Sequence, residues 1–308
     1  MSEQSMTSRA SARHYLLLGA LAFSWGSGFL FVELALLDLP PVMIAMGRTA
    51  VATAVLYAAA LRQGHSLPAL TGNRQLWLIL TALAVVGHAL PFFLMAQAQT
   101  DVDSNLAGIV IGATPLVTLV VVHFGTRDEK MTRTRIMGVA AGFLGIVVLL
   151  GPGALAGLRG GAGDVGSDLL AQALLVLVCF SFAFNALIAR RMAPLPPAVA
   201  AASVSLIATV MLLPFAIAVD PDLSLSPGWQ AIGAVFFLGA IGTGAATLLF
   251  FILVQQRGAN FVISANYLLP LVAMVLGVAF LAEQPRPEAF GAMALICGGI
   301  WLSNRPSK

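Results

Sequence analysis

Two fully charged side chains, Glu33 and Arg48, lie inside apolar sequence near the start of the chain. They flank a turn predicted at Leu39-Pro40-Pro41. At about 1.5 Å of rise per residue, both lie roughly 7–11 Å from that turn, at similar depth. A charge in hydrocarbon costs about 3 kcal/mol or more, so each must face a partner or a wet cavity. The two residues therefore predict either a structural ion pair, with Arg48 balancing Glu33, or a site for substrate or a proton.

A second group of side chains recurs at helical spacing. His88, Phe92, Met95 and Gln99 follow one another at intervals of 4, 3 and 4 residues, which places them on one face of a helix. Imidazole titrates near neutral pH and suits a proton relay. A core histidine hydrogen-bonded to a carbonyl explains the same residue equally simply. We include His88 and Phe92 among the candidate contacts to substrate.

Further polar and aromatic residues lie deep within apolar stretches, where they predict the wall of a polar pocket. Each also has a plain packing interpretation. Two prolines inside apolar stretches, Pro115 and Pro270, predict kinks that act as hinges. The remaining candidate substrate contacts are Trp25, Ser27, Asn185, Asn266 and Tyr267.

The composition is that of a membrane protein. Hydrophobic residues make up 59% of the 308 residues and charged residues only 9%, whereas soluble domains carry about 25% charge. The basic residues are scattered through short segments, so we expect no nucleic-acid partner. Cys179 and Cys297 lie inside apolar runs without metal-ligand spacing. We therefore expect no metal and no cofactor. No catalytic motif is evident either, so we expect no enzyme.

Apolar runs separated by Pro, Gly and charge predict an all-α integral membrane fold with ten transmembrane helices. The polar N-terminus carries no predicted cleavage site for a signal peptide. The predicted spans are 14–36, 41–61, 75–98, 103–124, 134–151, 168–189, 197–219, 228–253, 259–281 and 286–303.

Basic residues fix the predicted orientation. With the N-terminus in the cytoplasm, cytoplasmic segments hold 13 of the 16 Lys and Arg residues, outer loops hold Arg159 and Arg286, and Arg48 lies within a span. Both termini are then cytoplasmic. The predicted location is the bacterial inner membrane, with the lipid bilayer as surroundings, and we expect a monomer or a weak homodimer.

The chain also repeats itself. Leu39-Pro40-Pro41 recurs as Leu195-Pro196-Pro197 at an offset of 156, and Pro115 recurs as Pro270 at 155. Each half contains five predicted spans, an odd number, so the halves enter the membrane from opposite sides. This predicts two inverted five-helix repeats around a site at mid-membrane. We place the first repeat at 14–151, a Gly-rich linker at 152–167 and the second repeat at 168–303.

These features together resemble the EamA-like branch of the drug/metabolite transporter superfamily, and the likeness covers nearly all of 14–303. The chain departs from the family pattern at Glu33, where a basic residue is frequent, and at Leu269, where Glu is common. The matching segments are Trp25-Gly26-Ser27, Leu39-Pro40-Pro41, Arg48, Thr114-Pro115, Asp128-Glu129, Gly138–Gly145, Gly239–Gly244, Arg257-Gly258-Ala259, Pro270, Glu283 and Gly291–Gly299.

The resemblance implies a secondary transporter with a small-molecule substrate, exporting amino acids, drugs or similar metabolites, with proton coupling as one option. Uptake or exchange of metabolites is the first alternative. A passive channel and a membrane-embedded lipid enzyme are weaker ones. We expect the helices over 14–36, 75–98, 168–189 and 259–281 to line the central cavity.

Overall fold

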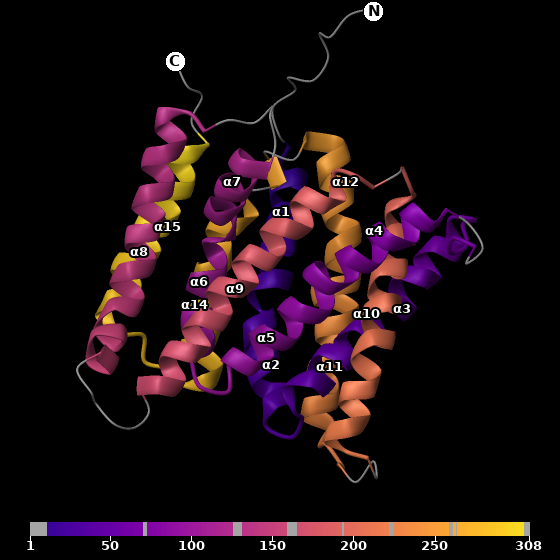
Figure 1. Cartoon of the computed structure of the whole chain (residues 1–308), viewed down its shortest axis with the longest axis horizontal. Coiled ribbons are helices and arrows are strands. Elements are labelled where there is room, and N and C mark those ends of the chain that lie inside the picture. The colour runs from indigo at the N-terminus through magenta and orange to yellow at the C-terminus, as the bar shows by residue number, and fades with distance from the viewer. Residues whose placement is uncertain are drawn as a thin grey trace, which may run out of the picture.

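The computed structural model describes residues 11–69, 73–125, 131–158, 165–192, 194–221, 225–258, 261–262 and 264–304. Within these ranges all regular structure is helical, and the helices form one bundle (Figure 1). Seven helical stretches of the described chain are long and apolar enough to cross a bilayer. They are Ala12–Leu36, Pro41–Arg62, Arg74–Ala98, Ser104–Gly125, Asp168–Ala189, Pro197–Val219 and Trp229–Arg257.

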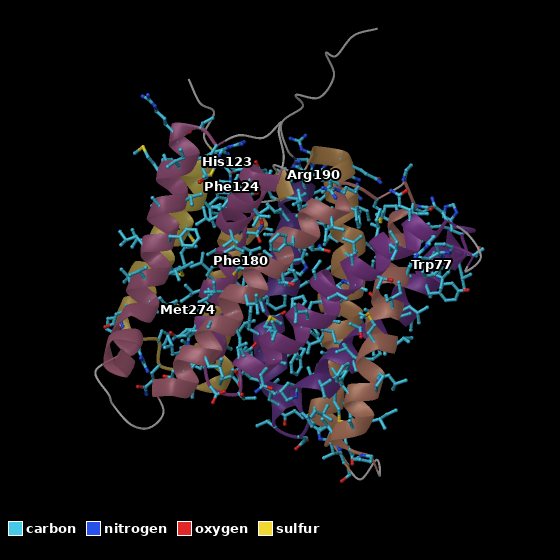
Figure 2. The ribbon with its side chains drawn as sticks, viewed as in Figure 1. Trp77, His123, Phe124, Phe180, Arg190 and Met274 are labelled. Atoms are coloured by element: carbon cyan, nitrogen blue, oxygen red, sulfur yellow. The ribbon has the colours of Figure 1, made fainter. Side chains whose placement is uncertain are left out.

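Large apolar side chains cover the outside of this bundle. Phe215, Phe236 and Phe280 are each more than 60% exposed, and many Leu, Ile and Val side chains are also exposed. Monomeric soluble proteins rarely leave apolar surface of this extent uncovered, whereas lipid tails solvate it well. Inside the bundle lie residues such as Phe180 and Met274 (Figure 2). The chain is a multi-pass membrane protein.

The first half of the chain contains two broken helices and one π-helical segment. The predicted span 14–36 is interrupted at Ser27, and the span 103–124 is interrupted at Ala113, two residues before Pro115. The helices are α1 (Ala12–Gly26), α2 (Gly28–Leu36), α3 (Pro41–Arg62), α4 (Arg74–Ala84), η1 (Val85–Ala89), α5 (Leu90–Ala98), α6 (Ser104–Gly112), α7 (Thr114–Gly125) and α8 (Arg133–Leu158).

The second half has the same kinds of element. Pro270 lies inside α14, and a second π-helical segment interrupts the eighth predicted span. The helices are α9 (Val165–Ala189), α10 (Pro197–Val219), α11 (Trp229–Gly239), η2 (Ala240–Ala245), α12 (Ala246–Arg257), α14 (Ala265–Leu281) and α15 (Pro287–Ser303).

Two extensive helix pairs join the halves. α8 lies along α15 on the left of the view, and α3 packs on α10 on the right (Figure 1). At the second pair, the buried hydroxyl of Thr49 accepts a hydrogen bond from Thr209 at 2.9 Å. Polar contacts of this kind hold helices together where lipid gives no hydrophobic drive for association.

Acidic side chains of each half accept hydrogen bonds from backbone N–H groups at a helix N-terminus of the other half. Glu283 accepts hydrogen bonds from the backbone N–H groups of Ser104 and Asn105, at 2.8 and 3.1 Å, at the start of α6. Asp38 accepts one from the N–H of Gly228, at 2.8 Å, just before α11. A carboxylate is favourable at a helix N-terminus because unpaired N–H groups and the helix dipole meet there.

The Gly-rich segment predicted as the linker over 152–167 is helical at both of its ends. α8 continues to Leu158 and α9 begins at Val165, so much of the Gly-rich segment is helical. Residues 159–164 lie outside the described part of the chain, as do Asp128 and Glu129. The apolar residues between the glycines explain the longer helix, because a glycine costs a helix only about 1 kcal/mol relative to alanine.

Neighbouring glycines on α15 give a matched test of the α8–α15 pair. A Cβ on Gly299 would collide with the backbone of Gly138 and Gly142, whereas a Cβ on Gly298 would meet nothing within 4 Å. We expect Gly299→Ala to lower the midpoint of thermal unfolding in detergent, since overpacking costs about 1–3 kcal/mol. Gly298→Ala is expected to be neutral or mildly stabilising. Equal effects of the two substitutions would contradict the close packing.

Candidate functional site

A cavity of about 310 Å³ lies between helices from both halves of the chain. Its wall is mainly apolar and aromatic, with a few polar side chains and one cation, which is the usual make-up of a small-molecule site. The lining residues are Trp25, Gly28, Phe29, Arg48, Gly87, His88, Phe92, Met95, Ile111, Thr114, Phe182, Asn185, Gly242, Thr243, Thr247, Asn266 and Leu269.

Arg48, Phe92 and His88 form a stack in this wall. The Arg48 guanidinium carbon lies 3.8 Å from the centre of the Phe92 ring, and the His88 ring stacks on Phe92 with 5.1 Å between centroids. Such a cation–π contact strengthens when water is excluded, and Arg48 is only 8% exposed. The His88 Nδ1 is 3.2 Å from the Ser205 hydroxyl of α10, which orients the imidazole.

Arg48 is also held by the second half of the chain. Its Nε donates a hydrogen bond to the hydroxyl of Thr243 at 2.8 Å. That hydroxyl in turn donates to the carbonyl of Leu238 at 3.0 Å, five residues earlier in the helix. Both hydrogen bonds are buried, so the position of this cation is defined by two helices at once.

Both π-helical segments face the cavity. η1 contributes Gly87 and His88, and η2 contributes Gly242 and Thr243. A π-segment widens the helix by one residue and redirects the side chains within it, and such segments occur frequently at functional sites. Here each one contributes a glycine and a neighbouring polar residue to the cavity wall.

The two prolines also lie beside the cavity. A proline donates no N–H to the carbonyl four residues earlier, which is Ile111 for Pro115 and Asn266 for Pro270. Ile111 and Asn266 both line the cavity, and the Ile111 carbonyl accepts a replacement hydrogen bond from the Thr114 hydroxyl at 2.6 Å. The Pro270 ring packs against Gly112, at the break between α6 and α7.

Much of the wall consists of residue pairs separated by one constant offset. In three of these pairs an apolar residue of one half corresponds to a polar residue of the other. The pairs 155 residues apart are Gly87 with Gly242, His88 with Thr243, Phe92 with Thr247, Ile111 with Asn266 and Thr114 with Leu269.

Six of the nine predicted substrate contacts line this cavity, and the structure brings them together from six helical segments. Beyond the four spans predicted to line the cavity, α3, α6, α7, η2 and α12 also contribute to the wall. The six residues are Trp25, Arg48, His88, Phe92, Asn185 and Asn266.

Ser27, Glu33 and Tyr267 lie away from the cavity wall. The Glu33 carboxylate accepts a hydrogen bond from Gln99 Nε2 at 3.0 Å, and the Tyr267 hydroxyl accepts one from Asn304 at 2.9 Å. The Ser27 hydroxyl donates to the carbonyl of Ser24, within its own polypeptide turn.

The expected ion pair between Glu33 and Arg48 is wrong. Each charged group has its own partner, Gln99 for the carboxylate and Thr243 with Phe92 for the guanidinium. Similar depth in the sequence did not place the two side chains on facing sides of their helices. Thr243 was missed because a threonine within an apolar run is unremarkable alone, yet it lies 155 residues after His88 and the repeat points to it.

The fold and the site define a class of protein, a multi-pass membrane protein with a small-molecule cavity between its helices. The chain belongs to the EamA-like transporter family, whose family model matches residues 13–151 and 169–305. The two matches together cover most of the chain, one in each half.

Full-length relatives are transporters by name. The "Uncharacterized inner membrane transporter YedA" of Escherichia coli strain K12 is 28% identical over 287 residues, covering 92% of this chain and 88% of that protein. The "Uncharacterized transporter YoaV" of Bacillus subtilis is 22% identical, with 94% and 96% covered. A solved crystal structure matches with a TM-score of 0.66 at 23% identity, covering 96% of this chain and 98% of the other, and supports the fold.

The hydrogen bond from Arg48 to Thr243 gives a stability prediction. Thr243→Val removes the acceptor of a buried charged donor, so we expect a loss of about 1–3 kcal/mol in unfolding free energy. Thr53→Val is the control, because the Thr53 hydroxyl bonds only the carbonyl of Thr49 in its own helix. Thermal unfolding of both variants in detergent compares them, and an equal shift would argue against the tether.

Proposed function

We propose that the chain is a secondary carrier that exports amino acids or similar small metabolites across the inner membrane by alternating access. The observation that carries this proposal is the cavity itself. It is bounded by polar groups from both halves, and its wall is anchored on both halves through Arg48 and Thr243. A movement of one half against the other must therefore reshape it.

We further propose ten membrane-spanning helices arranged as two inverted repeats, with the first over 14–151 and the second over 168–303. Several observations support this. The family model matches twice, η1 and η2 begin 155 residues apart, and α3 and α8 pack on the helices expected to be their counterparts, α10 and α15. Packing between equivalent elements is what a pseudo-two-fold axis produces.

Both ends of the chain are proposed to be cytoplasmic. The two described ends contact the start of α14 and the segment just before it: Tyr15 packs on Phe261 with ring centroids 5.6 Å apart, and Asn304 donates to Tyr267. This supports the same side of the membrane for both. The excess of Lys and Arg in the segments on that side favours the cytoplasm.

In this carrier the six predicted residues that line the cavity contact substrate, and Pro115 and Pro270 act as hinges. Pro270 of α14 packs at the break between α6 and α7, so a bend in α14 at this proline would displace that break. His88 is the candidate for moving a proton. We assign no substrate contact to Ser27, Glu33 or Tyr267, which lie outside the cavity wall. The protein is proposed to act as a monomer or a weak homodimer.

Counterflow in proteoliposomes tests the transport mechanism. A thermal-shift screen of amino acids and related metabolites first selects a ligand, since a ligand bound to the folded state raises the unfolding midpoint by mass action. We expect saturable uptake of the labelled ligand against an excess of unlabelled ligand inside. Flux that does not saturate and shows no counterflow would indicate a channel instead. Net inward transport of the ligand in intact cells would favour an uptake carrier over an exporter.

A pair of glycines tests whether this cavity is the transport site. A Cβ on Gly87 would lie 2.5 Å from Asn185 Oδ1, whereas a Cβ on Gly233 of α11, which is not part of the cavity wall, would meet nothing within 4 Å. We expect Gly87→Ala to displace the Asn185 amide and to raise the ligand concentration needed for half-maximal counterflow by about fivefold to tenfold, or about 1–1.4 kcal/mol. Gly233→Ala is the control and is expected to change that concentration little. Equal counterflow for Gly87→Ala and wild type would place the site elsewhere.

A further inference from the structure

The charge of Arg48 is not neutralised within the described structure. Arg48 is more than nine-tenths buried and lines the cavity, and none of the described residues along that wall is acidic. Glu33, the carboxylate that the sequence offered as its counter-charge, accepts a hydrogen bond from Gln99 instead.

The hydrogen-bonding capacity of this guanidinium is also largely unused. Arginine has five N–H donors. Among the described residues only one of them has an acceptor, the Nε group bonded to Thr243. One face of the guanidinium is covered by Phe92. The terminal N–H groups are therefore left for something that enters the cavity, and a buried cation without a counter-charge is costly until an anion arrives.

The rest of the wall suits an apolar body. Trp25, Phe29, Met95 and Phe182 supply apolar and aromatic surface, whereas Asn185 and Asn266 are polar without charge. No described wall residue offers a carboxylate to an ammonium group. A cavity of about 310 Å³ is at the small end for ligand pockets, which run from about 300 to 1,000 Å³.

We propose that the cavity selects small organic anions, with one carboxylate on a compact apolar or aromatic body, over zwitterions and cations with the same body. The proposal rests on the proposed carrier function and, among the small metabolites considered there, places organic acids ahead of amino acids, which are zwitterions. The carboxylate binds the free N–H groups of Arg48, a geometry that the planar guanidinium matches with two parallel hydrogen bonds. The ring or alkyl body contacts the aromatic wall.

A series of three ligands with one body and different charge tests this on the wild-type protein. 3-Phenylpropionate is the anion, phenylalanine the zwitterion and 2-phenylethylamine the cation. Thermal shifts of the full chain in detergent give apparent affinities. We expect the anion to bind at least about tenfold more tightly than phenylalanine, which corresponds to about 1.4 kcal/mol, and the amine to give no shift. Acetate and chloride are expected to give none.

Arginine variants provide a second readout. Arg48→Gln is expected to abolish the preference for the anion, and Arg48→Lys to retain part of it, because lysine keeps the charge without the planar fork. Arg62→Gln is the matched control, on the same helix but exposed at its end. The comparison among the three ligands on wild-type protein stands even where Arg48→Gln fails to fold.

The outcomes separate the two proposals. Tighter binding of phenylalanine or the amine, or an equal shift with chloride alone, overturns the anion preference. Absence of binding by all three compounds, with counterflow of another metabolite intact, overturns it as well and leaves the carrier standing. Absence of saturable counterflow across the whole metabolite screen overturns the proposed carrier function itself.

Discussion

The whole structure depends on the lack of water in the bilayer. Each backbone polar group within the hydrocarbon must be satisfied by the protein, which restricts the described chain to helices and confines irregular backbone to the interior. The irregular segments obey this constraint. η1 and η2 lie against the cavity, and the break at Ala113 is covered by Pro270 of the opposite half. The outer surface is left to large apolar side chains such as Phe280. The cavity thus lies where the helices depart from regular α-helical geometry.

Arg48 shows how the two halves are joined through that interior. Its helix belongs to the first half, its hydrogen-bond acceptor Thr243 belongs to η2 of the second, and its guanidinium covers Phe92 beside η1. A buried cation must be satisfied by geometry that no single helix supplies. Glu283 and Asp38 make comparable connections at helix N-termini, where each carboxylate bonds the start of a helix in the other half. Charge is scarce in this chain, and the charges that are buried or semi-buried link segments distant in sequence.

The membrane class, the family and six of the cavity residues follow from local patterns. His88 and Phe92 share a helix face in the sequence and stack in the structure. The partner of each charged side chain could not be predicted. Glu33 and Arg48 have matching depth in the sequence, but the Glu33 carboxylate accepts a hydrogen bond from Gln99 and the Arg48 guanidinium donates one to Thr243. A search for α-helical periodicity of 3.6 residues does not predict π-helical segments. The internal repeat was therefore the one sequence feature that pointed to Thr243. The helical ends of the Gly-rich linker were missed because glycine content outweighed the apolar residues between them.

The residue pairs of the cavity wall have one more consequence. At positions 155 residues apart the two halves place different chemistry in the wall: Phe92 is paired with Thr247, Ile111 with Asn266, and Thr114 with Leu269. A ligand that reversed its direction in this cavity would exchange apolar contacts for polar ones at these three pairs. The wall is therefore asymmetric, and a bound ligand with one polar and one apolar end is expected to adopt a single orientation.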